Sequence, residues 1–309
     1  MWLIIICIIQ IMLIPFASPL FIGIVRKIKA VFQNRAGASI FQPYKDLRKL
    51  FNKDEVISAD ASWIFKFAPY IIFSVTIIIG ASIPIFSTVF KDNPLSDFLT
   101  FVYLIALSTF FIALAGLDVG SAFGGFGSSR EMTIAALTEG GLIFSLLALS
   151  FEAHSSNLFV ISDAISSISV ISFIPILLAF LAFLIAMLSE TARYPFDNPA
   201  THLELTMIHE AMILEYSGKR LALIEWAAAN KFLIFLTLGA NLFFPWGIDT
   251  TIGFLSIVIA MFVFLLKVLI LCLFVAVLES TISKFRFFRL PDLLFISFIL
   301  SIISISLIL

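Results

Sequence analysis

Long apolar runs separated by shorter polar stretches dominate the pattern of this chain. Continuous apolar runs occur near residues 2–25, 64–90, 98–118, 131–151, 169–189, 226–247, 251–278 and 291–309. An α-helix needs about 20 such residues to cross a hydrocarbon core about 30 Å thick. The pattern therefore predicts an all-α, polytopic integral membrane protein with about eight transmembrane helices. No internal repeat or low-complexity linker divides the runs, so we expect a single transmembrane domain over residues 1–309.

The charged residues between the runs predict the orientation of the helices. Eight crossings put both termini on one side of the membrane and the loops 26–63, 119–130, 190–225 and 279–290 on the other. Of the 19 Lys and Arg residues, 15 lie in these four loops, whereas the opposite loops contain only Lys91. By the positive-inside rule the four loops are cytoplasmic and both termini lie outside. We expect a multi-pass protein of the inner, cytoplasmic membrane of the cell.

Composition agrees with this class and excludes several others. The chain is 61% hydrophobic and 13% charged, whereas a soluble domain carries about 25% charged residues. A formal net charge of -1 gives no reason to expect a nucleic-acid partner. The two cysteines, Cys7 and Cys272, lie in apolar runs, so this chain cannot supply a four-thiolate iron–sulfur site. No basic stretch precedes the first apolar run, so we expect a retained span and not a cleaved signal.

The first long polar stretch predicts a short amphipathic helix on the membrane surface. Apolar positions recur at helical spacing from Tyr44 to Phe51. The basic residues among and after them are Lys45, Arg48, Lys49 and Lys53. Two compatible readings remain: a basic loop that sets the topology, or a dock for a cytoplasmic partner.

The fourth apolar run is preceded by a glycine-rich stretch that begins at Gly120. No Gly-Lys-Ser/Thr follows it, so a nucleotide site is not expected. Ser128 and Glu131 have the spacing of a capping box, which predicts that the fourth span begins there. Glu139 would then lie some 15 Å into the membrane, at a rise of about 1.5 Å per residue.

Glu139 and Lys267 are ionisable groups near the middle of predicted spans. Burying charge in a bilayer costs free energy, so such groups are functional unless a partner neutralises them. One reading is that the two residues neutralise each other as a buried pair. The other is a proton relay, for which carboxyl groups are suited because burial raises their pKa towards neutrality. Asp118, Glu190 and Glu279 stand at cytoplasmic ends of spans and would extend such a path.

The loop 190–225 is unusually acidic. It contains six of the 20 carboxylates of the chain: Glu190, Asp197, Glu204, Glu210, Glu215 and Glu225. Such a loop in a membrane protein either docks a partner or handles protons. Asn198 and Pro199 have the residue types of an N-cap and a first helical position, and on that helix Glu204 and Glu215 would share a face.

The histidines of this loop do not indicate a metal site. His202 and His209 are about two turns apart on a helix, too far to bind one metal, and the His-Glu-x-x-His motif is missing. The order of serine, histidine and cysteine residues suggests no catalytic nucleophile. We therefore expect neither a metal nor catalysis in this chain alone.

Four motifs carry a resemblance to a known family. They are Glu190-x-x-Arg193-x-Pro195-Phe196-Asp197, Glu215-Tyr216-Ser217-Gly218, Gly127-Ser-Ser-Arg-Glu131 and Phe41-Gln-x-Tyr-Lys-Asp46. Over nearly its whole length the chain resembles the subunit-1 membrane protein of respiratory complex I. It is more similar still to the homologue in membrane-bound group 4 [NiFe] hydrogenases, which include formate hydrogenlyase and hydrogenase-4.

The resemblance implies a non-catalytic subunit of an oxidoreductase complex, which anchors a peripheral arm and begins a path of buried acids. It implies no cofactor in this chain, with the [NiFe] centre and iron–sulfur clusters in partner subunits. The partners would be the hydrogenase large and small subunits, or complex I peripheral-arm homologues, and antiporter-like membrane subunits in the lipid bilayer. With Lys267 added, the expected proton path is Glu131, Glu139, Glu190, Asp197, Glu204, Glu215 and Lys267. The residues expected to dock the partner are Arg35, Gln42, Tyr44, Lys45, Asp46, Arg130 and Arg193.

One departure from the complex I pattern bears on quinone binding. Complex I proteins usually continue from the aspartate with Leu-x-Glu-Gly-Glu-Ser-Glu-Leu, but here Asp197 is followed by Asn-Pro-Ala-Thr-His-Leu-Glu-Leu. Two carboxylates are therefore absent, which favours the hydrogenase branch and disfavours quinone. A quinone-cavity subunit of an NADH:quinone oxidoreductase is the first alternative. An independent ion or solute transporter is the second, although no matching pair of Gly/Pro-interrupted spans supports it.

Overall fold

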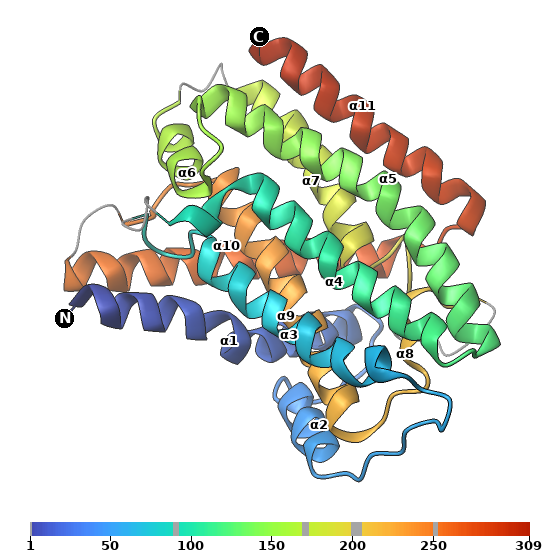
Figure 1. Ribbon diagram of the computed structural model, residues 1–309. Helices are drawn as coiled ribbons and strands as arrows, with labels where there is room; N and C mark the ends of the chain where they lie inside the picture. Colours follow the sequence, from blue (N-terminus) through green and yellow to red (C-terminus); the bar gives the residue numbers. More distant parts are fainter. Residues whose placement is uncertain (1, 89–92, 169–172, 199–205, 250–252) are drawn as a thin grey trace.

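The computed structural model describes residues 2–88, 93–168, 173–198, 206–249 and 253–309 (Figure 1). Within these ranges the chain forms α-helices, two 3-10 helices at Pro94–Ser96 and Phe287–Arg289, and no β-strand. The α-helices are α1 Trp2–Phe32, α2 Gln42–Phe51, α3 Trp63–Ser82, α4 Phe98–Asp118, α5 Ala122–Ala153, α6 Leu158–Ser166, α7 Phe173–Glu190, α8 His209–Ile213, α9 Gly218–Leu242, α10 Phe254–Thr281 and α11 Leu290–Ile308.

Eight of the described helices are long and apolar enough to cross a membrane. They are α1, α3, α4, α5, α7, α9, α10 and α11. This confirms the predicted all-α, polytopic fold. Figure 1 shows α2 and α8 together at one end of the bundle, while α1 begins and α11 ends away from it. Which side of the membrane that end faces stays a prediction from the distribution of Lys and Arg.

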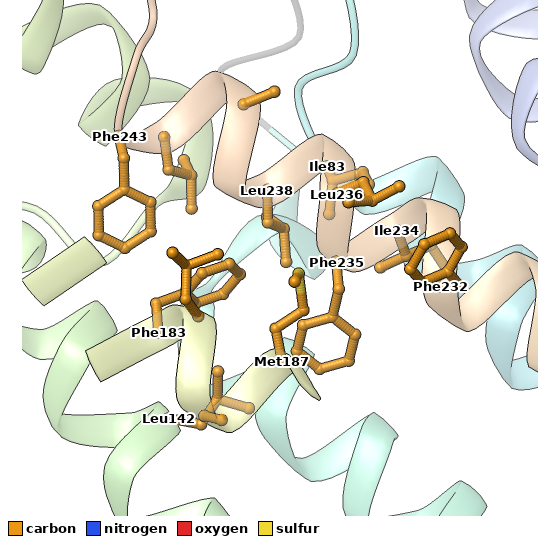
Figure 2. Packing of buried hydrophobic residues seen from close by; sticks show 14 of the residues in the cluster. Ile83, Leu142, Phe183, Met187, Phe232, Ile234, Phe235, Leu236, Leu238 and Phe243 are labelled. Carbon is orange, nitrogen blue, oxygen red and sulfur yellow. The ribbon is translucent and has the colours of Figure 1, made fainter. Parts of the chain in front are cut away.

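The helix α9 is the centre of the bundle. Every residue from Phe232 to Leu242 is buried, as expected for a helix that is apolar on all sides. Figure 2 shows Phe183 and Met187 of α7 packing against this stretch. The ring of Phe183 lies 5.0 Å from that of Phe243 and 6.0 Å from that of Phe235, measured between centroids. These contacts fix the rotation of α9 and thereby the direction of its few polar side chains.

The helix α5 begins well before the predicted start. Its N-cap is Ser121, whose side chain accepts a hydrogen bond from the backbone of Gly124. The predicted capping box is wrong, because the Ser128 hydroxyl instead donates to the carbonyl of Ala113 on α4, 2.8 Å away. The predicted loop 119–130 thus shrinks to three residues. The glycines allow close helix contact, since a Cβ on Gly124 would lie 2.3 Å from the Gly116 carbonyl oxygen.

The helix α3 ends at Ser82, short of the predicted boundary near residue 90. Pro84 explains this, because proline lacks an N–H and disfavours a helical residue before it. The following backbone is buried but not helical, and side-chain amides satisfy its carbonyls. Gln10 donates to the Ile83 carbonyl over 3.0 Å, and Asn241 donates to that of Pro84 over 2.9 Å. Non-helical backbone at membrane depth requires such protein partners.

Candidate functional site

A cavity of about 920 Å³ lies at the end of the bundle that carries α2 and α8. Residues of α1, α2, α3, α4, α5, α8, α9 and α10 line it, together with Glu190 at the end of α7 and the residues that follow. The carboxylates in its lining are Asp46, Glu131, Glu190, Asp197, Glu210, Glu225 and Glu279. The cations are Arg26, Lys29, Arg35, Lys49, Lys53, Arg193 and Lys231. The distribution of these charges decides what the cavity can do.

The first ion pair joins α7 to α9. Lys231 Nζ lies 2.7 Å from Glu190 Oε2, and the two side chains are 15% and 4% exposed. Lys231 also reaches the hydroxyl of Thr109 on α4, at 3.4 Å. Beside Glu190, the hydroxyl of Ser189 is hydrogen-bonded to that of Thr138 on α5, at 2.7 Å. The pair therefore sits where three spans meet the cavity.

A second cluster of charges joins α1, α10 and the end of α7. Glu279 lies 2.9 Å from Arg193 and 2.6 Å from Lys29. The Arg193 guanidinium also covers the ring of Phe232, 4.0 Å from its centroid, as in a cation–π contact. Arg193 is thus 8% exposed and held inside this chain, although the sequence placed it at the docking surface. Its part in docking stays a prediction.

Asp197 holds the loop after α7 in place. Its Oδ1 lies 2.6 Å from Lys284, and its Oδ2 accepts hydrogen bonds from the backbone N–H of Ile208 at 3.2 Å and of His209 at 3.1 Å. Charge-assisted bonds of this kind are the stronger ones in proteins. Asp197 therefore links three segments: the end of α7, the start of α8 and the residues after α10.

His209 and Glu210 of α8 line the cavity and were not singled out for the path from the sequence. Burial lowers the pKa of His209 to about 4, with Lys231 adding to the effect. Burial raises the pKa of Glu210 to about 7, with Glu225 adding to it and Arg26 opposing it. A carboxyl group with this pKa accepts and releases protons at neutral pH. No sequence pattern identified these two, because the five-residue helix α8 lacks a recognisable start.

The remaining predicted path residues lie in different places. Glu131 lines the cavity, and Glu139 lies farther along α5, half-buried and without a hydrogen bond or ion pair to a described residue. Glu215 is exposed and outside the cavity lining. Glu204 falls outside the described residues, as does the helix expected to begin at Pro199.

Lys267 does not pair with Glu139, so that alternative is wrong. Lys267 donates to the Phe244 carbonyl at 2.8 Å and to the side chain of Asn241 at 3.0 Å. These groups lie at the end of α9, where unpaired carbonyls and the helix dipole favour a cation.

The predicted helix α2 is present, but its polar side chains are partly used within the chain. Gln42 donates to Asp46 over 2.8 Å, and the Tyr44 hydroxyl donates to the Phe16 carbonyl of α1. Burial raises the pKa of Tyr44. Arg130 on α5 donates to the Met207 carbonyl at 3.1 Å. Of the predicted docking residues, Arg35 and Lys45 are exposed.

The motif Glu215-Tyr216-Ser217-Gly218 has a structural role. The ring of Tyr216 stacks on that of Phe65 with centroids 3.9 Å apart, and its hydroxyl donates to the Phe65 carbonyl at 2.9 Å. Ser217 exchanges hydrogen bonds with the backbone of Val56. Gly218 begins α9 at φ 55°, a left-handed conformation that suits glycine. The motif therefore joins the polar stretch after α2 to the start of α9.

In the part of the chain that the structure describes, no group of three or more His, Cys, Asp and Glu residues is placed to hold a metal ion. The described side chains around the cavity supply acid–base and electrostatic groups. Paired, buried charges and the carboxyl group of Glu210, with its pKa near 7, are arranged around a space large enough for water or a small ligand.

Comparison with known proteins gives consistent relatives. The family described as "NADH dehydrogenase" matches residues 3–309. "Hydrogenase-4 component C" of Escherichia coli (strain K12) is 34% identical over 310 residues, covering 98% of this chain and 95% of that protein. "Formate hydrogenlyase subunit 4" of the same strain is 28% identical, covering 90% of each chain. "NADH-quinone oxidoreductase subunit 8" of Rhodothermus marinus is 28% identical over 232 residues, covering 71% of this chain and 66% of that protein.

One solved structure supports the fold. A chain from the membrane-bound sulfane sulfur reductase (MBS), described as an archaeal respiratory membrane complex, matches with a TM-score of 0.83. The match covers 98% of both chains at 20% identity, so it concerns the arrangement of the helices.

Proposed function

Because the chain belongs to the NADH dehydrogenase subunit 1 family, we propose that it is the membrane-anchor and proton-path subunit of a hydrogenase-like respiratory complex. The observation that carries the proposal is the buried, acid-lined cavity at the end with α2 and α8. The peripheral arm, with the [NiFe] centre and iron–sulfur clusters in its own subunits, would rest on that end. This chain would supply no cofactor and no catalytic residue.

We assign the cavity residues to two groups, those that hold the structure through ion pairs and those that transfer protons. Glu279 and Asp197 are each held by cations of this chain, which suits them to anchor the structure. Glu210 titrates near neutral pH and Glu131 lines the same space, so they are suited to take a proton from the arm. Glu190 is neutralised by Lys231, and a shift of Lys231 would make Glu190 a proton acceptor. From there Glu139, on the neighbouring helix, would take the proton into the membrane.

The relatives favour a hydrogenase-like complex over an NADH:quinone oxidoreductase. The two hydrogenase-type relatives cover 90% or more of this chain, whereas the quinone oxidoreductase relative covers 71%. We place the protein in the cytoplasmic membrane, with α2 and α8 on the cytoplasmic side, because that end carries most of the Lys and Arg residues. Antiporter-like membrane subunits would be its neighbours within the bilayer.

A subunit inventory of the complex purified from its native membrane tests the proposal. We expect [NiFe] and iron–sulfur subunits to co-purify in equal amounts with this chain. Recovery of the chain by itself, with ion or solute transport by the lone protein in liposomes, would overturn the proposal.

The second candidate is the quinone-cavity subunit of an NADH:quinone oxidoreductase. The size of the cavity favours it, since ligand sites of about 300–1,000 Å³ bury most of a drug-sized molecule. The same inventory separates the two candidates, because a flavin-containing arm and bound quinone are expected only for the second.

A further inference from the structure

Buried and exposed charges occupy different parts of the cavity, which we call its floor and its mouth. The floor consists of buried groups that are held in ion pairs within this chain: Glu190, Arg193, Asp197 and Glu279 are each at most 8% exposed. The mouth instead carries four exposed cations, Arg26, Arg35, Lys49 and Lys53. None of these four side chains has a hydrogen bond or an ion pair with another residue in the described ranges. Arg26 still interacts electrostatically with Glu210 and Glu225, and the other three cations give the mouth positive charge that the chain itself leaves unpaired.

One face of α2 forms the apolar wall between the mouth and the floor. Pro43, Leu47 and Leu50 recur at helical spacing and line the cavity, whereas Lys45 lies on the opposite face together with Arg48. Other apolar side chains of the wall are Ile22, Val25, Ile72 and Ile112. An occupant that fits these surfaces has an anionic head and an apolar tail.

The mouth lies beside surface that is suited to lipid. Tyr44 is hydrogen-bonded to the carbonyl of Phe16, in the interior of the first membrane span, so the start of α2 lies alongside that span. Large apolar side chains are exposed at Phe16 (65%), at Ile40 (37%) and Phe41 (60%) before α2, and at Val31 (66%) and Phe32 (55%) at the end of α1. Exposed apolar patches of this kind in a membrane protein contact acyl chains. An amphiphile therefore has a route into the cavity from the bilayer.

We propose that the cavity binds an anionic phospholipid, with its phosphate group on the cations of the mouth and one acyl chain along the apolar face of α2. Clusters of Lys and Arg beside a transmembrane helix recognise anionic headgroups. The proposal deepens the proposed function, on which it rests, because a subunit that does not use quinone leaves this volume to another hydrophobic ligand. An acidic segment of the peripheral arm is the competing occupant, and the test separates it from a lipid.

The test compares two double variants of the purified complex. In Lys49→Gln/Lys53→Gln both changes lie at the mouth, and in Lys45→Gln/Arg48→Gln both lie on the opposite face of α2 with the same loss of charge. Each complex is placed in nanodiscs of phosphatidylcholine with added phosphatidylglycerol, re-extracted, and its retained lipid measured by native mass spectrometry. We expect the first variant to retain about fivefold less phosphatidylglycerol than the wild type, and the second to differ by less than about twofold.

Several results would overturn the lipid proposal. Equal losses in the two variants would show a general surface effect, and equal retention of phosphatidylcholine would show no preference for an anionic headgroup. Recovery of quinone from the complex, or cross-linking of a photoreactive residue at Leu50 to a peripheral subunit, would assign the cavity to that occupant. A complex that couples ion movement but retains no phosphatidylglycerol would contradict the lipid proposal without contradicting the proposed function.

Discussion

Lys231 of α9 crosses the cavity to Glu190 at the end of α7, with 2.7 Å between Nζ and Oε2. Glu190 is part of the cavity floor, and the neighbouring Ser189 is hydrogen-bonded to Thr138 of α5, the helix that carries Glu139. Two charges buried together are stable mainly because each cancels the cost of burying the other. The arrangement makes Lys231 the cation that compensates the buried charge of Glu190.

Replacement of Lys231 should therefore destabilise the protein. We expect Lys231→Met to lower the free energy of unfolding by about 3–5 kcal/mol, because Glu190 is left as an unpaired buried charge. Thermal unfolding of the purified complex in detergent measures the effect. The control is Arg220→Met, which breaks the more exposed pair with Glu55 and should cost at most about 1 kcal/mol. Equal losses in the two variants would contradict a special role for the Lys231 pair.

Glu139 is expected to carry protons and not to hold the fold together. Because it has no hydrogen bond or ion pair to a described residue, Glu139→Gln should leave assembly and hydrogenase activity with a soluble electron donor unchanged. Ion movement coupled to that activity should be lost, since the amide of glutamine cannot take up a proton at neutral pH. Glu152→Gln, at the other end of α5, is the matched control and should keep coupling. Normal coupling in Glu139→Gln would remove this residue from the path.

Asp197 should matter for both turnover and coupling. Asp197→Asn removes the charge that binds Lys284 and weakens the bonds to the start of α8, at a cost of about 1.5–3 kcal/mol. We expect faster amide hydrogen exchange over α8, together with lower turnover and lower coupling. Unchanged amide hydrogen exchange over α8, together with normal turnover and coupling, would show that Asp197 is not required for either.

The spans were predictable from the sequence because each apolar run is a local property that the bilayer selects by length. Their ends were less predictable, because distant contacts decide them. The end of α3 depends on Pro84 but also on the amide of Asn241, far along the chain. The start of α5 depends on the N-cap Ser121 and on the close approach of Gly124 to α4, which the spacing of Ser128 and Glu131 does not reveal.

The site was predictable in its residue types but not in its pairings. The motifs identified Glu131, Glu190 and Asp197, and these residues do line one cavity. The partner of Glu190 was not predictable, because Lys231 faces it only when the packing of α7 on α9 fixes the rotation of both helices. For the same reason the sequence pointed to Glu215, which is exposed, and gave no role to Glu210, which is in the cavity.

Lys267 was expected on the proton path, and its contacts suggest a test that separates two roles. Lys267→Met removes the donor to the Phe244 carbonyl and to Asn241 at the end of α9, which should cost about 1–3 kcal/mol of stability. Lys66→Met, at an exposed position of α3, is the control and should cost little. We expect the folded fraction of Lys267→Met to couple ion movement normally. Lost coupling at unchanged stability would instead put Lys267 on the path.

The neighbours His209 and Glu210 should give stability opposite dependences on pH. Between pH 6.5 and about 4 the unfolded chain protonates His209 while the folded chain does not, so this residue makes stability rise with pH. Between pH 4.5 and about 7 the folded chain keeps Glu210 protonated while the unfolded chain does not, so this residue makes stability fall with pH. Each slope is at most about 1.4 kcal/mol per pH unit.

Single variants should separate these two contributions between pH 4.5 and 6.5. The reference is the double variant His209→Gln/Glu210→Gln. Relative to it, Glu210→Gln keeps only the histidine and should gain stability as the pH rises. His209→Gln keeps the backbone N–H that Asp197 accepts and should lose stability over the same range. Thermal unfolding of the three purified complexes at several pH values measures both slopes. Parallel profiles would mean that water reaches α8 and that neither side chain is desolvated, which would also remove Glu210 as a proton carrier at neutral pH.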